Sequence, residues 1–381
     1  MTFARRLVFL AGLCCCPTIS CMTAAQASED KSSQSLKVAS QTDVASPSPG
    51  PERLELGIAA DSEEGLIGSV YVGKNNLIPG VFTFATFRNT GETRRAQAGL
   101  FKHDACGPNI DAGLDLNHRR DAYDDQGYRQ SNMSVEPYLQ FRTGHWGTVT
   151  TGLGYRWVTL DGIATDASPS IHRDEGTDRG LYARVSWTLP DVMTTSRFGM
   201  SVGMDGHVYN LDSSSRAFLQ TEGWTRTKLA LIPDDLSLLN VVRVGYMHGL
   251  DGEPVSLADR FFIGGARLRG FEVRHVGPRV GNYFVGGERY ATASLDLVKK
   301  VGTLWGSQVS VGAFVDVGTL WGVGSQTDAQ DGNRAAIRVS TGLAVTFAVA
   351  GVPVSLYVAK PVRKEPQDSE QNFGVSVSMR F

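Results

Sequence analysis

The residues whose types could support catalysis or metal binding are scattered along this chain. Its seven histidines, among them His103 and His145, do not lie near cysteines at the spacing that holds zinc. The acidic run at 121–125 lacks the spacing and the terminal glutamate of a calcium loop, and we expect a solvated loop there. The sequence contains no GxSxG motif and no phosphate-cradling glycine loop. We therefore predict no enzyme activity, no metal site and no cofactor.

One stretch, residues 259–288, combines residues in an unusual way: DRFFIGGARLRGFEVRHVGPRVGNYFVGGE. It is too rich in Gly and Arg for a strand and far longer than a usual connection, so we expect it to be functional or disordered. Gly264 and Gly265 permit the crowded or left-handed backbone of a fold-back. The tetrapeptide LRGF at 268–271 then carries one charged and one aromatic anchor. An ordinary surface loop is the alternative.

The elements that must position this stretch are strands. Apolar residues alternate at period two, in segments separated by Gly, Asp, Asn and Pro. Helical periodicity is scarce, and after the N-terminus no apolar run is long enough for a transmembrane helix. Glycine, at 43 of 381 residues, exceeds its average share of roughly 7%. The sixteen candidate strands are 54–60, 65–73, 80–88, 95–103, 109–118, 131–141, 147–159, 179–188, 196–209, 216–231, 238–249, 287–299, 307–317, 335–347, 352–360 and 372–381.

Two regularities favour a membrane barrel over a soluble β-sandwich. The long polar connections follow odd-numbered strands, as do the extracellular loops of outer-membrane barrels. One parity of each late strand is apolar and the other is small or polar, which is the pattern of a lipid-facing barrel wall. We therefore predict an all-β protein of the cell outer membrane, a sixteen-stranded antiparallel transmembrane β-barrel with a long lumen-inserted loop. Both chain ends are expected on the periplasmic side.

The N-terminus indicates export. Residues 1–27 have a basic start, a short apolar core and a small-x-small site, and we predict a signal peptide cleaved after Ala27. A membrane anchor and a lipoprotein signal ending at Cys21 are the alternatives. Residues 28–52, rich in Ser, Pro and Gln, predict a disordered linker, and 53–381 the barrel.

Charge and cysteine usage limit the partners. The chain has 37 basic against 39 acidic residues, which gives no nucleic-acid footprint. Four of its five cysteines lie in the predicted signal, so Cys106 remains alone and no disulfide framework is expected. The run HRRD at 118–121 suggests a strand-end charge cluster near lipopolysaccharide head groups.

Residues 260–381 resemble the barrel C-terminus of the BamA family, also called the bacterial surface antigen family. RFFIGGARLRGF matches its loop motif, ASLDLV at 293–298 and FVDVGTLW at 314–321 match the strands that follow, and FGVSVSMRF is similar to its closing strand. The N-terminal half fits the strand count but has no motif of equal specificity.

The resemblance implies that the loop enters the barrel and that Arg269 pairs with Asp296 and Asp316 on the inner wall. Parity agrees, because both aspartates lie on the polar faces of their strands. A charge-assisted anchor of this kind is favoured in a partly dehydrated interior. Three unrelated lumen charges are the alternative. The candidate site thus comprises the loop motif and lumen anchor, Gly264, Gly265, Leu268, Arg269, Gly270, Phe271, Asp296 and Asp316, and the C-terminal strand signature, Phe373, Val375, Val377, Met379 and Phe381.

For function, the resemblance implies insertion or translocation of proteins, or of lipids, at the outer membrane, through a seam between 54–60 and 372–381 that opens sideways. Assembly members of the family carry POTRA domains ahead of the barrel. Only 28–52 separates the predicted signal from the first strand, so we expect a barrel-only member lacking POTRA domains. The alternative is a passive channel or a structural surface barrel. Expected partners are outer-membrane lipid and lipopolysaccharide, and either exported protein clients or a periplasmic partner in trans.

Overall fold

The computed structural model describes residues 52–123, 126–190, 195, 197–212, 216–304, 306–324, 329, 333–349 and 352–380. The predicted signal, nearly all of the predicted linker, and Phe381 lie outside these residues.

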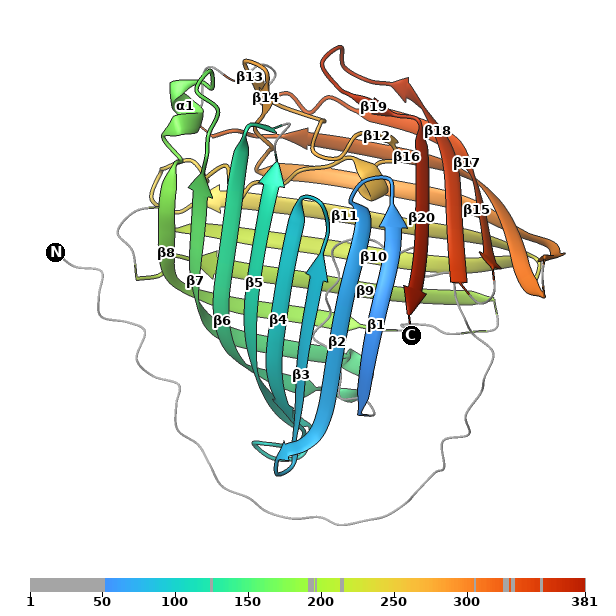
Figure 1. Ribbon diagram of the computed structural model, residues 1–381, viewed down its shortest axis with the longest axis horizontal. Helices are drawn as coiled ribbons and strands as arrows, with labels where there is room; N and C mark the ends of the chain where they lie inside the picture. The colour runs from blue at the N-terminus through green and yellow to red at the C-terminus, as the bar shows by residue number, and fades with distance from the viewer. Residues whose placement is uncertain are drawn as a thin grey trace. The chain divides into compact units, whose positions relative to one another are not determined.

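In the described part, sixteen antiparallel strands close into one barrel, which confirms the predicted fold (Figure 1). They are β1 (Arg53–Asp61), β2 (Gly65–Ile78), β3 (Val81–Asn89), β4 (Thr93–Lys102), β5 (Ile110–Tyr123), β6 (Tyr128–Arg142), β7 (Thr148–Asp161), β8 (Gly176–Leu189), β9 (Phe198–Tyr209), β10 (Phe218–Ile232), β11 (Leu236–Gly249), β15 (Arg289–Leu304), β16 (Ser307–Trp321), β17 (Arg338–Val349), β18 (Val352–Arg363) and β20 (Phe373–Arg380).

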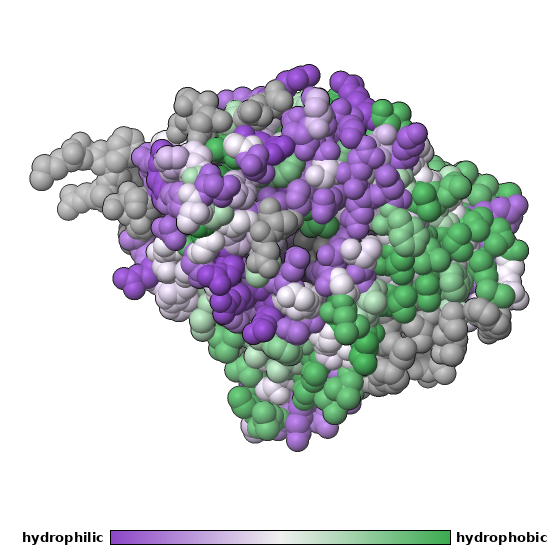
Figure 2. Space-filling model, turned by 45° about the horizontal axis from the view of Figure 1, so that its top comes forward, coloured by the Kyte–Doolittle hydropathy of each residue, from purple (hydrophilic) through white to green (hydrophobic). Residues whose placement is uncertain are grey.

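Alternation along the strands separates an apolar outer wall from a mixed interior. Outward side chains such as Leu343 and Val358 are 66% and 59% exposed, whereas inward Phe314 and Asp316 are 2% and 1% exposed. Because successive side chains of a strand point to opposite faces, the period-two pattern is enough to produce this division. In Figure 2, hydrophobic residues lie over the barrel wall and hydrophilic residues cover the end turned toward the viewer.

The two ends of the barrel differ. One end, here the loop end, carries residues 162–175, with the short helix α1 (Pro169–His172), and the long connections 250–288 and 364–372. The opposite end, here the turn end, carries tight connections such as 79–80 and 233–235. No helix in the described residues is long and apolar enough to cross a membrane.

Residues 250–288, here the lumen loop, connect β11 to β15 and are largely buried. Their apolar side chains join two clusters with inward residues of the wall, one around Phe271 and Leu268 and one around Val280 and Val285. The expectation that this stretch contains no strand is wrong for three two-residue segments. These are β12 (Gly270–Phe271), paired with β19 (Glu370–Gln371), and β13 (Arg279–Val280), paired with β14 (Tyr283–Phe284).

Several strands extend beyond their predicted ends. β2 continues to Ile78, because Lys74 and Asn75 pair with β3 despite their turn-like sequence. The acidic run at 121–125 is not simply a solvated loop. Asp121 and Tyr123 belong to β5 and are 2% and 8% exposed, since both lie on its inward face.

Candidate functional site

The tip of the lumen loop brings Arg269 to two carboxylates on the inner wall. Its Nε donates to Oδ2 of Asp316 at 2.8 Å and its Nη2 to Oδ1 of the same residue at 2.7 Å. Its Nη1 donates to Oδ1 of Asp296 at 2.8 Å. Its backbone N–H also reaches Asp316, at 3.0 Å. The structure thus places together the three charged residues of the predicted site.

Neighbouring residues complete the environment of this guanidinium. Ser294 accepts from Nη2 of Arg269 at 2.9 Å, and its hydroxyl lies 2.7 Å from Oδ1 of Asp316. The guanidinium carbon lies 3.5 Å from the centre of the Phe314 ring, a cation–π contact. Burial alone would lower the pKa of Arg269, but the hydrogen bonds and charges of Asp316 and Asp296 raise it above its usual value. The cation is therefore fixed in place and charged.

The glycines of the motif allow the backbone to reach this position. Gly264 has φ +121°, and a Cβ there would lie 2.1 Å from the carbonyl oxygen of Glu272. Gly270 has φ +92°, and a Cβ there would lie 3.1 Å from Cβ of Ser340 on β17. The hydroxyl of Ser340 donates to the carbonyl of Arg269. Side chains other than glycine would strain or displace the fold-back at both positions.

Leu268 and Phe271, on either side of the charged centre, are fully buried. Leu268 packs against Gly318 of β16, where an added Cβ would lie 3.1 Å from the leucine methyls. Gly265, the remaining glycine of the motif, lies against the β1–β2 turn, and a Cβ there would lie 2.5 Å from Oε2 of Glu63. The tip is thus packed closely against the inner wall and the β1–β2 turn on both sides of Arg269.

A second ion pair, not predicted from the sequence, fixes the connection 364–372 against the lumen loop. Arg338 at the start of β17 donates to both oxygens of Asp368, at 2.9 and 3.0 Å, and their side chains are 2% and 0% exposed. Asp368 also accepts from the backbone N–H of Gly277 in the lumen loop, at 3.4 Å. Together with the β12–β19 pairing, this pair links the lumen loop to the segment that leads into β20.

The lumen loop also contacts β7 and β10 of the wall. Asp259, near its start, forms a bidentate pair with Arg156 of β7, at 2.6 and 3.2 Å. Arg267, two residues before the central arginine, lies 3.5 Å from Oε1 of Glu222 on β10. Glu222 additionally accepts from the hydroxyl of Tyr290, at 2.7 Å. The loop therefore spans the interior between β7, β10 and the β15–β17 wall.

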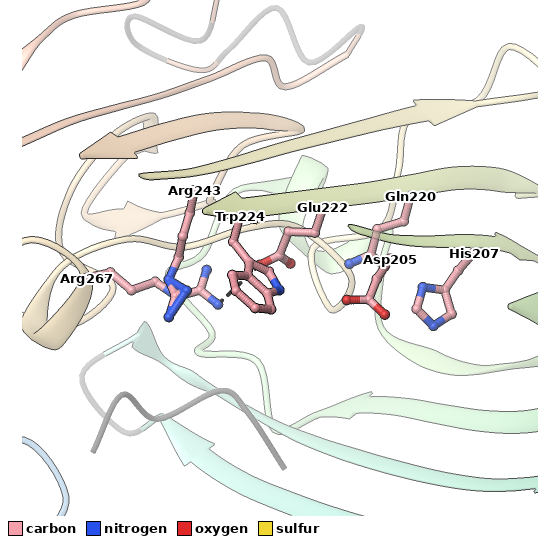
Figure 3. Close-up of a pocket in the computed structure, with 7 residues that line it drawn as sticks. All are labelled: Asp205, His207, Gln220, Glu222, Trp224, Arg243 and Arg267. Atoms are coloured by element: carbon pink, nitrogen blue, oxygen red, sulfur yellow. Dashed lines mark hydrogen bonds and ion pairs between the residues drawn. The ribbon is translucent and has the colours of Figure 1, made fainter. Parts of the chain in front are cut away.

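Beside the Arg267 contact lies a polar cavity of about 220 Å³ inside the barrel. In Figure 3, Arg267 and Arg243 converge at one end, Glu222 and Trp224 lie in the middle, and Asp205 and His207 lie beyond them. No group of His, Cys, Asp or Glu in the described part of the chain has the arrangement of a metal site. The cavity holds charges of both signs and continues the hydrophilic interior beneath the loop.

The seam between the first and last strands is short. β1 pairs with β20 over Gly57–Asp61, opposite Ser376–Arg380, whereas it pairs with β2 along its whole length. Phe373, at the start of β20, is 53% exposed on the outer wall. Val375 and Val377 share its parity, Met379 belongs to the seam register, and Phe381 lies outside the described residues.

Sequence reasoning missed the Arg338–Asp368, Arg156–Asp259 and Arg267–Glu222 pairs. The alternation along the strands could have indicated Arg156, Glu222 and Arg338, because each is a charged residue at a position whose side chain points into the barrel. No comparable signal marks Asp368, because it lies in a polar connection whose composition is typical of a solvated loop.

Comparison with known proteins supplies the family context. The model of the Omp85 superfamily domain matches residues 72–381. A SAM50-like protein of Schizosaccharomyces pombe is 38% identical over 84 residues, which are 22% of this chain and 18% of that protein. The chain thus aligns with less than a fifth of this curated relative.

The fold is similar to those of solved structures, among them BamA and CdiB. BamA from Haemophilus ducreyi, in a form lacking POTRA domains 1–3, superposes with a TM-score of 0.74 and 18% identity, over 86% of this chain and 70% of that one. CdiB from Escherichia coli superposes with a TM-score of 0.61 and 12% identity, over 86% and 63% of the two chains. At these identities the likeness is one of fold.

Proposed function

The chain belongs to the Omp85 superfamily, whose domain model matches it over residues 72–381, and from this premise we propose that it is an outer-membrane barrel that inserts or translocates proteins. The apolar outer wall would face the hydrocarbon of the bilayer. The loop end would face the cell exterior, because outer-membrane barrels carry their long loops there, and the turn end the periplasm. The predicted signal peptide would direct export.

The observation that carries this proposal is the short register between β1 and β20. β20 pairs with β1 over the five residues Gly57–Asp61, whereas β2 pairs with all nine residues of β1. Separation of these five pairs would leave an edge of β1 open. An unpaired strand edge is a template on which another extended segment adds by backbone hydrogen bonds. In a bilayer an open edge is costly, so an incoming strand of a client would be favoured there.

The anchored lumen loop would keep the rest of the wall in shape while this seam opens. Its ion pairs with the wall involve β7, β10, β15 and β16, and none of those described involves β1 or β20. Separation of β1 from β20 would therefore leave these contacts intact. A loop that fills the loop end also supports this function over the passive channel that the sequence left open.

The first test is depletion of the protein in its native cells, followed by quantitative outer-membrane proteomics. We expect a fall in other outer-membrane barrels for an insertase, or loss of a few exported proteins for a dedicated transporter. An unchanged outer-membrane proteome would refute the proposal and favour a channel or structural barrel.

A cross-link across the seam tests the mechanism. Complementation with Ala60→Cys/Val377→Cys, directly opposite across β1 and β20, should fail when the disulfide forms and recover on reduction. The matched control, Ala60→Cys/Leu66→Cys, joins β1 to β2 and should complement in both states. Both variants need a Cys106→Ser background, because Cys106 is exposed. Full activity of the cross-linked seam would exclude lateral opening.

A further inference from the structure

Two arginines face each other on the outer wall near the loop end. Arg94 of β4 and Arg120 of β5 are directly opposite in the register and both are exposed. They have the outward parity of Leu100 and Leu116 on the same strands. His118, also exposed, precedes Arg120 on this face. Opposed residues on neighbouring strands have Cβ atoms about 5 Å apart, so the two guanidinium groups project into the same volume.

This pair is unfavourable as the protein stands alone. Like charges directly opposite on a sheet repel each other. Neither arginine forms an ion pair with another residue that the structure describes. The outward carboxylate of Asp161, two strands further along the wall, pairs instead with Arg129, at 3.0 Å. An anion placed between Arg94 and Arg120 would relieve the repulsion, and guanidinium groups bind phosphate in the fork geometry that they use for carboxylates.

The register also gives the level of this pair relative to the apolar wall. The outward row that contains it is polar throughout and consists of Asn89, Arg94, Arg120, Ser131 and Thr159. The next row toward the turn end is mixed and consists of Phe87, Ala96, His118, Met133 and Trp157. The row after that is apolar apart from one tyrosine and consists of Ala85, Ala98, Leu116, Val135 and Tyr155.

The apolar wall thus ends at the mixed row, where Phe87, Met133 and Trp157 are 48%, 48% and 36% exposed. Aromatic residues typically lie at the boundary between hydrocarbon and head groups. The two arginines follow this boundary directly, on the loop-end side. Along β5 itself the outward order toward the loop end is Leu116, His118 and Arg120, so in a bilayer the arginine pair lies at the level of the lipid phosphates.

We propose that Arg94 and Arg120 form a binding site for a phosphate group of lipopolysaccharide in the outer leaflet. The phosphate lies between the two guanidinium groups, and the acyl chains run down the apolar wall below it. His118 lies beside the acyl–head-group boundary. This inference goes beyond insertion or translocation and needs only that the barrel spans the outer membrane with its loop end outside.

The test is a titration of the purified full-length barrel in detergent with lipid A, followed by native mass spectrometry. The wild type should bind the bisphosphorylated form more tightly than the dephosphorylated form. Arg94→Gln/Arg120→Gln should lose about tenfold to thirtyfold in affinity for the bisphosphorylated form only, because each basic residue near a lipid phosphate contributes about a factor of five. The affinity of Arg94→Lys/Arg120→Lys for the bisphosphorylated form should lie between that of the wild type and that of Arg94→Gln/Arg120→Gln.

The matched control is Lys102→Gln/Lys299→Gln, which removes the same charge from the turn end of the barrel. Both lysines are exposed, and their loss should leave lipid A affinity unchanged. The proposed site would be overturned by any of three results. These are an equal loss of lipid A affinity in the control, an unchanged affinity in the arginine-to-glutamine variant, or no preference of the wild type for the bisphosphorylated lipid. Displacement by inorganic phosphate at the concentration of the lipid would assign the pair to free phosphate instead. Heat-modifiability of each variant verifies folding.

Discussion

At Arg269 one side chain holds two carboxylates that would otherwise repel each other inside the barrel. Its Nη2 lies 2.7 Å from Asp316 and 3.2 Å from Asp296. Removing one partner of a buried ion pair leaves the other charge uncompensated, which typically costs about 3–5 kcal/mol. The position is therefore more sensitive than a surface ion pair.

We predict that Arg269→Ala lowers the free energy of unfolding by about 3–5 kcal/mol and reduces the yield of folded barrel. The measurement is urea unfolding in detergent, together with heat-modifiability on gels. Arg129→Ala, which removes an exposed pair with Asp161, should cost less than about 1 kcal/mol. Equal stability of the two variants would show that the lumen contact is no anchor.

Glu63 makes the contact between the β1–β2 turn and the lumen loop depend on pH. Burial, and then the charges of Asp61 and Glu64, raise its pKa from 4.5 to about 8. The folded protein therefore keeps a proton that the unfolded chain has lost. This contribution to stability is complete below pH 4.5 and is lost as the pH rises toward 8.

We accordingly expect the wild-type unfolding temperature to fall between pH 5 and pH 8, and the slope to be smaller in Glu63→Gln. The difference between the two curves isolates this carboxyl from other titrating groups. Parallel curves would mean that Glu63 does not take up a proton on folding.

Among the elements, the connection 364–372 depends on one aspartate. Asp368 holds Arg338 with both oxygens and also accepts from the N–H of Glu365, at 2.8 Å. Asp368→Asn would leave a buried guanidinium without its counter-charge, so we expect β19 to separate from β12. Limited proteolysis of intact cells should then cleave the lumen loop or the connection 364–372. Glu370→Gln, which removes a half-exposed pair with Lys364, is the control and should remain resistant.

The elements also show how far sequence reasoning reaches. Every predicted barrel strand corresponds to an observed one, because alternation needs only a two-sided wall. Strand ends were less certain: β8 begins at Gly176, before the predicted 179, since polar Thr177 and Asp178 continue the ladder with β7. The charged centre was located by motif resemblance and parity. Asp368 was missed because its partner, Arg338, lies about thirty residues away at the start of β17, and nothing in the sequence around Asp368 indicates that it is buried.

At the scale of the whole molecule, the lumen loop and the seam divide the barrel into a fixed and a separable part. Ion pairs of the loop connect β7, β10, β15 and β16, while the loop touches the β1–β2 turn only beside Glu63 among the contacts described, and β1 adjoins β20 over a short register. Alternation along the strands did not predict this division, because a strand has the same alternating sequence whatever the length of its pairing with the next strand. It follows from which residues pair across the closure.

Hydrogen exchange should reveal the same division. The described register joins β1 to β20 over only five residues, so β1 should exchange faster than β10, which is paired over longer registers along both edges. In the oxidised Ala60→Cys/Val377→Cys barrel, exchange should slow in β1 and stay unchanged in β10. Equal protection of β1 and β10 in the wild type would mean that the closure is as stable as any other pair of strands. The proposed route for client strands would then have to lie elsewhere.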